Sequence, residues 1–459
     1  MDLDARELYR ALTARDARFD GLFFVGVSST GVYCRPVCTA RTPREENCSF
    51  HTSAAAAEQA GFRPCLICRP ELAPGRARVD AVGRLADRAV RQIEDGVELS
   101  EVARGLGVTD RHLRRAVTSR FGVSPVALAQ TGRLLTAKRL LTDTALPVGE
   151  VALASGFSSI RRMNTLFRER YHMSPTDLRR RAGGAGDTVK CRVPYRPPYA
   201  WEAILQFLEM RAISGVEAVV DGRYFRAVED GWIAVGPGKR DALEIETSGS
   251  LARQLPKILR RVRRLFDTEA EPSAIAERLG DLAAEEPGLR LPGAWDGFEI
   301  GVRAILGQQV SVAGARTVAG RLAAAFGTPV ETPWPVSVAF PSSARMAEAD
   351  PNEIAALGII GNKARAIVAL ARAMEGGLKL SPGVDPEETT SALVAIKGIG
   401  PWTASYIAMR ALGYPDAFPA GDLMLMRALG AKTPAEATAL VEPYRPWRAY
   451  AAIHLWRTL

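Results

Sequence analysis

The sequence predicts a multidomain, mostly helical protein with three successive parts. Five of the six cysteines fall in the first 75 residues, which indicates a small α+β module built around a metal ion. The next stretch is arginine-rich and contains an internal repeat, which indicates a doubled helix-turn-helix. Strand-like alternation and then a long helical region follow. These predict an α+β unit with an antiparallel sheet, followed by a helical domain with a helix-hairpin-helix.

The composition indicates a globular protein with a polyanionic partner. A chain of 459 residues holds roughly three domains, at about 150 residues per domain. With 47% hydrophobic and 24% charged residues, general disorder is excluded. The net charge of +9 and the pI of about 9.4 favour nucleic acid as a partner. The polar amino terminus and the lack of a run of about 18 apolar residues argue against a signal peptide and a membrane span. We therefore expect a cytoplasmic protein.

Changes in composition suggest the domain boundaries. We expect a cysteine-rich module at 1–76, a DNA-reading domain at 77–182 and a glycine-rich linker at 183–189. An α/β subdomain at 190–290 and a helical domain at 291–459 should complete the chain. No heptad repeat suggests dimerisation, so we expect a monomer.

The cysteines have the spacing of metal ligands. Cys34-x-x-x-Cys38 and Cys65-x-x-Cys68 form two pairs, and 27 positions separate Cys38 from Cys65. Four thiolates suit tetrahedral zinc. From the cysteines alone, a zinc site that only stabilises a small domain is the better explanation. Cys48 lies outside the ligand pattern, and we expect it to be a packed side chain.

The flanking residues favour a reactive site instead. The segments Gly31-Val32-Tyr33-Cys34-Arg35-Pro36, Arg44-Glu45-Glu46-Asn47 and Gly61-Phe62-Arg63-Pro64-Cys65 resemble the amino-terminal domain of the Ada family of methyl phosphotriester repair proteins. The resemblance covers nearly all of residues 5–72 and implies one zinc ion. Its ligands would be Cys34, Cys38, Cys65 and Cys68, with Cys34 as the methyl acceptor.

The implied chemistry of this module is coherent. Zinc keeps a thiolate deprotonated, so the nucleophile needs no separate base. Methylation of one sulfur removes one of two net negative charges, which should strengthen binding to a phosphate backbone. Arg35, Arg44 and Arg63 are candidates for phosphate contacts, and a solvated basic face is the alternative.

The middle of the chain contains two similar units. Residues 101–108 are echoed by 150–157, and 120–125 by 170–175, at a period of about 50 residues. The doubled unit resembles the AraC-type DNA-binding domain from about 80 to 180. Met163 and His172 depart from the family pattern, which usually has an aromatic residue and a glycine there. A helical bundle with exposed arginines is the alternative.

Two recognition helices are expected in this region. The first should begin near Thr109, a good N-cap. Arg and Asn read guanine and adenine edges, but Arg serves phosphates equally well, so both roles stay open. The candidates for DNA contact are Asp110, Arg111, His112, Arg114 and Arg115 in the first helix, and Ser158, Ser159, Arg161, Arg162 and Asn164 in the second.

Residues 393–404 predict a helix-hairpin-helix. A tight Gly398-Ile399-Gly400 turn separates two helices, and the second opens at Pro401, the favoured first helical position. The glycines let backbone N–H groups approach a phosphate, and the helix N-terminus adds a favourable dipole. We expect Lys397 and Thr403 to contact DNA as well. The hairpin alone indicates only that a nucleic acid backbone is bound.

An aspartate adds chemistry to the hairpin. Asp422 follows Trp402 by 20 positions, and this pair resembles the helix-hairpin-helix glycosylase superfamily. The chain from about 190 to 459 resembles its AlkA family of 3-methyladenine glycosylases, with matches at 197–199, 289–293, 301–308 and 446–451. The resemblance implies that Asp422 stabilises the cationic sugar as the base leaves. An aspartate after glycine is otherwise a common helix N-cap.

The same resemblance implies a base pocket. An aromatic pocket favours a flipped, cationic base through cation–π attraction, although each ring could also be ordinary core. Trp402 stands where bifunctional members carry a lysine, so a monofunctional enzyme is expected. Gln309 stands at the position of an apolar wedge and costs more to desolvate. The residues matching the pocket are Phe207, Trp402, Tyr406 and Trp456.

Together these resemblances imply a DNA alkylation repair and response protein. It would release alkylated purines of the 3-methyladenine type, transfer a methyl group from DNA phosphotriesters to Cys34 and activate transcription. Double-stranded DNA and RNA polymerase would be its partners. The alternative is a methylation-sensing activator whose carboxy-terminal domain only grips DNA. No cysteine precedes a histidine, so repair of O6-methylguanine is not expected.

Overall fold

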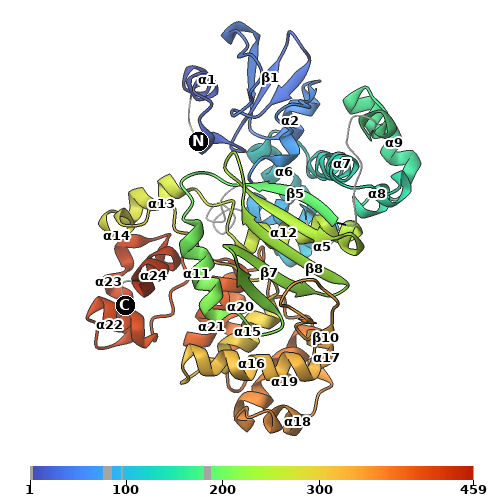
Figure 1. Cartoon of the computed structure of the whole chain (residues 1–459). Helices are drawn as coiled ribbons and strands as arrows, with labels where there is room; N and C mark the ends of the chain where they lie inside the picture. Colours follow the sequence, from blue (N-terminus) through green and yellow to red (C-terminus); the bar gives the residue numbers. More distant parts are fainter. Residues whose placement is uncertain (1–3, 76–84, 95–96, 180–187, 458–459) are drawn as a thin grey trace. The chain divides into compact units, whose positions relative to one another are not determined.

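The computed structural model describes residues 4–75, 85–94, 97–179 and 188–457 (Figure 1). The chain divides into two compact units. The first comprises residues up to 197 with 239–243 and 249–259, and the second comprises the remainder of 198–459. The mostly helical, multidomain architecture expected from the sequence is confirmed. In the described residues, no helix is long and apolar enough to cross a membrane.

The first unit begins with a small α+β module. Helix α1 (Ala5–Thr13) precedes a sheet with the strand order β3–β1–β2–β4. Strand β1 pairs antiparallel with β2 and β3, and β2 pairs parallel with β4. Phe24 and Tyr33 meet edge to face in the core, with ring centroids 5.8 Å apart. The remaining elements are β1 (Phe24–Val27), β2 (Val32–Cys34), β3 (Cys48–His51), α2 (Ala54–Gln59) and β4 (Arg63–Pro64).

The two predicted helix-turn-helix units follow in the same unit. Thr109 caps the first recognition helix, as the sequence predicts, and Ser159 caps the second. His172 ends the second helix in the left-handed conformation, with φ of 53°, at the position where glycine was expected. The helices are α4 (Leu85–Glu94), α5 (Leu99–Gly105), α6 (Asp110–Phe121), α7 (Pro125–Asp143), α8 (Val148–Ala154), α9 (Ile160–Tyr171) and α10 (Pro175–Arg179).

Helix α7 is bonded to the α+β module within this unit. The Thr131 hydroxyl donates to Glu58 Oε2 at 2.7 Å, and Lys138 pairs with Glu71. Thr131 and Lys138 are seven positions apart and therefore lie on one face of the helix. Arg69 bridges Glu71 and Asp143, at 2.8 Å to each carboxylate. The carboxylates of Glu58 and Glu71 are buried, so these bonds replace their hydration.

The predicted linker at 183–189 is only partly described. Residues 183–187 lie outside the described residues, and Thr188 and Val189 already belong to strand β5 (Thr188–Pro194). A five-stranded sheet has the order β5–β9–β8–β7–β6, and β6, β7 and β8 pair antiparallel. The strands are β6 (Glu217–Val220), β7 (Arg223–Val228), β8 (Gly231–Pro237) and β9 (Ala242–Ser248).

A buried ion network joins strands β6 and β7 of the second unit to one helix. Arg226 on β7 binds Glu217 at 3.0 Å and also binds Glu299 on α15 (Gly297–Leu306). Arg303, one turn further along α15, binds Glu299 at 2.7 Å and also binds Glu217. The paired arginines hold the pKa of Glu217 at about 2, although burial alone would raise it.

The rest of the second unit is helical. The residues after α21 continue as one turn of π-helix, η5 (Ala408–Leu412). The larger helices are α11 (Trp201–Arg211), α12 (Leu255–Leu265), α13 (Pro272–Leu279), α16 (Val312–Phe326), α19 (Gly361–Glu375), α20 (Pro386–Val394) and α24 (Arg448–Arg457). The shorter ones are α14 (Asp281–Ala284), α17 (Ser343–Ala347), α18 (Pro351–Ala356), α21 (Pro401–Ile407), α22 (Leu423–Leu429) and α23 (Pro434–Leu440).

Candidate metal centre and active site

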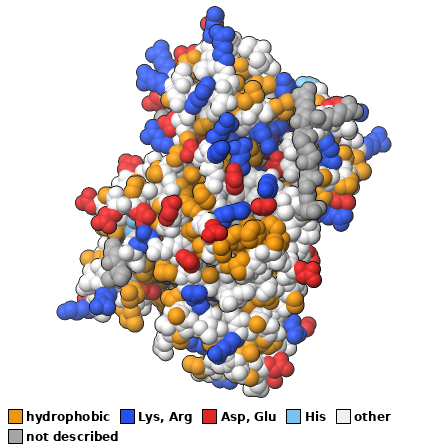
Figure 2. Space-filling view, viewed as in Figure 1, with side chains coloured by type: hydrophobic (Ala, Val, Ile, Leu, Met, Phe, Trp, Pro, Cys, Tyr) orange, Lys and Arg blue, Asp and Glu red, His pale blue; other side chains and the backbone are white. Residues whose placement is uncertain are grey.

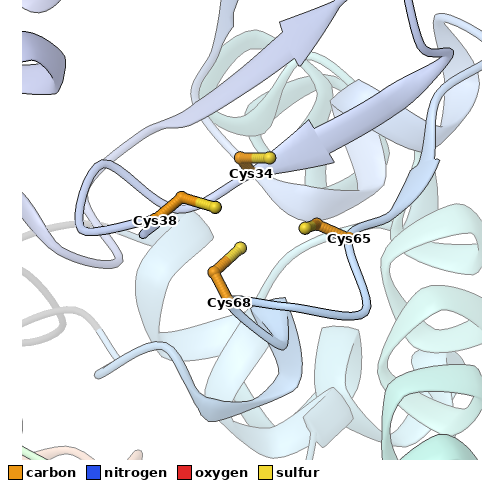
Figure 3. Close-up of side chains that lie close together, drawn as sticks. All are labelled: Cys34, Cys38, Cys65 and Cys68. Carbon is orange, nitrogen blue, oxygen red and sulfur yellow. The ribbon is translucent and has the colours of Figure 1, made fainter. Parts of the chain in front are cut away.

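The four predicted metal ligands converge on one point (Figure 3). Cys34 ends strand β2, and Cys65 directly follows β4, its parallel neighbour. The sulfur atoms of Cys34, Cys38, Cys65 and Cys68 all lie within 4.8 Å of one another. Four sulfur donors so placed fit a tetrahedral zinc ion. Cys48 is outside the cluster, as expected, and its thiol donates to the Arg44 carbonyl at 3.3 Å.

Arg35 is buried beside the cysteine cluster and has a structural role there. It is only 7% exposed, and its guanidinium donates to Asp20 Oδ1 at 2.8 Å and to the Cys68 carbonyl at 3.1 Å. Its backbone N–H donates to Cys68 Sγ at 3.3 Å. The guanidinium is thus buried and paired, and it braces a ligand loop; this arrangement does not favour the phosphate contact predicted for Arg35. The Arg44 side chain is 85% exposed and Arg63 is half-buried, so both keep a solvent-facing surface.

The recognition helices present their predicted polar residues to solvent. Arg111, Arg114 and Arg115 are exposed on α6. On α9, Arg161 and Arg162 are exposed and Asn164 is half-buried, while Met163 is fully buried in the core. Figure 2 shows many Lys and Arg side chains on the visible face of the first unit. These exposed arginines remain available to phosphates and to base edges.

Asp422 caps a helix and is held by two indole rings at the same time. Its Oδ1 atom accepts the backbone N–H groups of Met424 and Leu425, at 3.0 and 3.1 Å, at the start of α22. The indole N–H of Trp456 donates to Oδ1 and that of Trp402 to Oδ2, each at 3.1 Å. Asp422 is half-buried, and its four hydrogen bonds fix the direction of the carboxylate.

Three of the four predicted pocket aromatics lie together beside this carboxylate. Trp402 stacks on Tyr406, with centroids 5.6 Å apart and an interplanar angle of 15°. The ring centroids of Trp456 and Tyr406 are 6.3 Å apart, with an interplanar angle of 54°. The fourth, Phe207, is 8% exposed, and the guanidinium of Arg211 lies 3.8 Å from its ring centroid. Phe207 is therefore partly covered by a cation rather than open to a stacking base.

The hairpin places its two glycines in different environments. Gly398 has φ of 98°, and a Cβ atom there would lie 2.8 Å from the Cβ of Ala366. Gly400 precedes α21 as its N-cap, with φ of −89°. Lys397 is exposed at the turn. The side chain of Thr403 is 2% exposed and its hydroxyl accepts a bond from Gln308, so the DNA contact predicted for Thr403 falls to its backbone.

Comparison with known proteins gives the same order of domains. Four family models match: the metal binding domain of Ada over 7–71, a helix-turn-helix domain over 102–181, the AlkA N-terminal domain over 190–296 and the HhH-GPD superfamily of base excision DNA repair proteins over 302–438. A probable bifunctional transcriptional activator/DNA repair enzyme AlkA of Mycobacterium tuberculosis is 41% identical, covering 99% of this chain and 97% of the relative. The chain belongs to this family.

Two further comparisons concern only the second half of the chain. DNA-3-methyladenine glycosylase 2 of Escherichia coli is 39% identical over 58% of this chain and 95% of its own length. A 3-methyladenine DNA-glycosylase structure from Archaeoglobus fulgidus shares the fold, with a TM-score of 0.52 at 22% identity over 58% of this chain and 97% of that one. The chain is thus a DNA alkylation repair protein of the bifunctional AlkA family, with a zinc-binding methyl-acceptor domain of the Ada type.

Gln309, which was predicted to stand at a wedge position, has an unusual backbone conformation. Gln309 is exposed, with φ of 55°, in the loop between α15 and α16. Its neighbour Gln308 donates to the Gly398 carbonyl and to Thr403 Oγ1, each at 2.9 Å. Lys363 donates to the carbonyl of Gln308 at 2.7 Å. The loop with Gln309 is therefore fixed to the DNA-binding hairpin.

Arg410, on η5, was not predicted from the sequence and lies next to Tyr406 and Phe207. It is 4% exposed, and its guanidinium donates to the Tyr406 hydroxyl at 2.7 Å and to the Gly293 carbonyl at 3.1 Å. It also lies 4.9 Å from the centroid of Phe207. One signal was present: Arg410 is the single charged residue in the apolar run 407–412.

Proposed function

We propose that this alkylation repair protein performs its two chemistries at separate residues, with glycosidic hydrolysis at Asp422 and methyl transfer at Cys34. The observation that carries the first assignment is the fixed carboxylate of the half-buried Asp422 between the indole N–H groups of Trp402 and Trp456. The observation that carries the second is the four-sulfur cluster at the end of β2.

At Asp422 the carboxylate would stabilise positive charge on the sugar. As the bond from the sugar to the base breaks, its electron pair leaves with the base, and an alkylated cationic purine departs as a neutral molecule. The sugar is left electron-poor, and a nearby fixed anion lowers the energy of that state. Water then adds to the sugar and loses a proton. Since the side chain at position 402 is an indole and not an amine, no Schiff base forms, and the strand stays intact.

At Cys34 the reaction would be a direct methyl transfer. The sulfur lone pair attacks the methyl carbon of a phosphotriester, and the electron pair of the carbon–oxygen bond returns to the phosphate. The products are a thioether and an ordinary phosphodiester anion. Zinc, when bound by the four cysteines, keeps the sulfur anionic at neutral pH. Arg35 would keep the Cys68 loop in place through its bonds to Asp20 and to the Cys68 carbonyl.

The glycosylase assignment is tested with Asp422→Asn, because asparagine is also a good N-cap and should preserve α22. Duplex DNA with 3-methyladenine is incubated with wild-type protein and with the variant, and free base and strand breaks are measured separately. We expect base release by the wild type, a rate lower by about 100-fold or more in the variant, and strand breaks only after alkali. Equal release by both proteins, or strand cleavage without alkali, would contradict the assignment.

The methyl-acceptor assignment is tested by peptide mass spectrometry. After incubation with DNA that carries methylated phosphates, Cys34 should gain one methyl group. The matched control is Cys48→Ser, which changes a cysteine of the same module outside the cluster and should leave the transfer intact. A methyl group on Cys38, Cys65 or Cys68 instead would reassign the acceptor.

We further propose that the protein acts as a monomer in the cytoplasm and that its helix-turn-helix domain works together with RNA polymerase. The exposed arginines of α6 and α9 support a role at promoter DNA. A reducing compartment suits the free thiols of the cluster. Sedimentation of the purified protein tests the oligomeric state, and transcription from a template that binds the methylated protein tests the partnership.

A further inference from the structure

The hydroxyl group of Tyr406, a half-buried residue, lies among guanidinium groups of the second unit. Arg410 donates to its oxygen at 2.7 Å. Arg211, whose guanidinium lies 3.8 Å from the ring centroid of Phe207, adds a second positive charge near this hydroxyl. A phenol oxygen that accepts bonds from guanidinium donors retains one hydrogen, and that hydrogen can only be donated elsewhere. The arginines therefore determine that Tyr406 acts as a donor.

Arg410 is itself held by the backbone on its other side. Its Nη2 atom donates to the Gly293 carbonyl at 3.1 Å, and its Nε atom donates to the Pro292 carbonyl. These carbonyls belong to the segment before α15. The guanidinium therefore contacts three separate parts of the unit: that segment, Tyr406 on α21 and the ring of Phe207 on α11. Arg410 lies in the π-helical turn η5, and such turns are frequent at functional sites.

Electrostatics favour a strong donor at this position. Burial alone would raise the pKa of the Tyr406 phenol, but the positive charges of Arg410, Arg211 and Arg303 outweigh it and lower the pKa below its ordinary value. A more acidic hydroxyl forms a stronger hydrogen bond as a donor. The ring of Tyr406 stacks on Trp402, and the indole N–H of Trp402 donates to Asp422. The Tyr406 hydroxyl is therefore linked through one ring to the proposed catalytic carboxylate.

We propose that Arg410 is a positioning residue for base recognition. Together with Arg211 it directs the Tyr406 hydroxyl as a hydrogen-bond donor toward an acceptor atom on the edge of a flipped base. The pocket thus selects a base by an acceptor atom as well as by its positive charge and its flat surface. This inference rests on the proposed glycosylase function.

The test is a double-mutant cycle with Tyr406→Phe and Arg410→Gln. Single-turnover release of 3-methyladenine is measured for the wild type, both single variants and the double variant. We expect each single variant to release base about tenfold more slowly, which corresponds to the loss of one hydrogen bond. The double variant should be no slower than the slower of the two single variants. Effects that multiply, or no effect of Tyr406→Phe, would overturn the proposal.

A second measurement separates positioning from a general structural role. Binding is measured to duplex DNA with an abasic-site analogue, which engages the hairpin but offers no base. Both single variants should bind it as the wild type does, and a parallel loss of this binding would overturn the proposal. Should Arg410→Gln fail to fold, Tyr406→Phe decides alone, since it removes only the hydroxyl. If the wild type itself releases no base, the proposed glycosylase function fails, which is a different result.

Discussion

At the scale of single residues, the Asp422 carboxylate accepts hydrogen bonds from two backbone amides and two indole rings. The amide bonds make it the N-cap of α22, and the indole bonds hold it beside the rings of Trp402 and Trp456. The sequence alone left these two roles as alternatives for Asp422. In the structure they are compatible, because the capping bonds use only Oδ1, while Oδ2 accepts the indole N–H of Trp402.

The bond from Trp456 to Asp422 can be removed without removing an aromatic ring. Trp456→Phe loses the indole N–H that donates to Oδ1 at 3.1 Å. A hydrogen bond to a charged group is worth about 1.5–3 kcal/mol, so we expect base release to slow by about tenfold or more. Trp447→Phe is the matched control, because Trp447 packs against Tyr450 and its substitution should leave the rate unchanged. Equal rates for the wild type and Trp456→Phe would contradict the assigned role.

The protein is expected to lose stability in mild acid because His454 is buried in its neutral form. His454 is 6% exposed on α24, and burial, followed by the charge of Arg457, lowers its pKa to about 4. In the unfolded chain a histidine titrates near pH 6.5, so between that pH and about pH 4 the unfolded state binds more protons. The free energy of unfolding therefore falls as the pH falls through this window, by about 3 kcal/mol in all.

Denaturant unfolding at pH 7 and pH 4.5 measures this effect. The variant His454→Gln cannot titrate there, so its free energy of unfolding should fall less between the two pH values than that of the wild type. The same fall in both proteins would show that other groups cause it.

Sequence reasoning identified residues whose chemistry is local in the chain. The four cysteines have a ligand spacing that is visible without a fold. The burial of the Arg35 and Thr403 side chains could not be predicted, because it depends on contacts with Asp20 and Gln308, which lie 15 and 95 positions away. Arg410 was missed because its partners Pro292 and Gly293 are more than a hundred positions away.

At the scale of elements, the hairpin offers a paired test of two glycines. In Gly398→Ala the new Cβ would meet Ala366 at 2.8 Å, and the φ of 98° is strained for alanine. We expect a loss of about 1–3 kcal/mol in the free energy of unfolding. Gly400→Ala has an ordinary φ and no atom within 4 Å of the new Cβ, so its stability should change by less than about 0.5 kcal/mol. Equal changes in the two variants would contradict this account of the turn.

The stability of the first unit is expected to depend on the buried pair that Lys138 of α7 forms with Glu71. Lys138→Met leaves the Glu71 carboxylate, which is 1% exposed, with Arg69 as its remaining partner. Removal of one member of a buried pair costs about 3–5 kcal/mol, which denaturant unfolding can measure. The control is Glu150→Gln, which breaks a pair whose Arg253 side chain is 70% exposed and should not change stability measurably. A Lys138 variant as stable as the wild type would show that the pair is dispensable.

Helix ends and repeats were readable from the sequence because they depend on neighbours along the chain. Thr109 caps α6 as predicted, and the repeat of about 50 residues gives two similar helix pairs. The π-helical turn η5 was not predictable, since nothing in the run 407–412 distinguishes it from an α-helix. The start of β5 inside the expected linker had no turn or composition signal either.

At the scale of the whole molecule, the order of domains followed from motifs that are each local. The division into two compact units did not, because residues 239–243 and 249–259 group with the first unit although the surrounding chain belongs to the second. The thiolate cluster lies in the first unit and Asp422 in the second, so the two proposed chemistries use separate sets of residues.

The most direct test of the account measures both chemistries in one experiment. Wild type, Asp422→Asn and Cys34→Ser are each incubated with DNA that carries methylated bases and methylated phosphates, and free base and methylated protein are measured together. We predict that Asp422→Asn loses base release and keeps methyl transfer, while Cys34→Ser keeps base release and loses methyl transfer. The assignment of two independent sites would be wrong if either substitution abolished both activities. It would also be wrong if Asp422→Asn kept base release and Cys34→Ser kept methyl transfer.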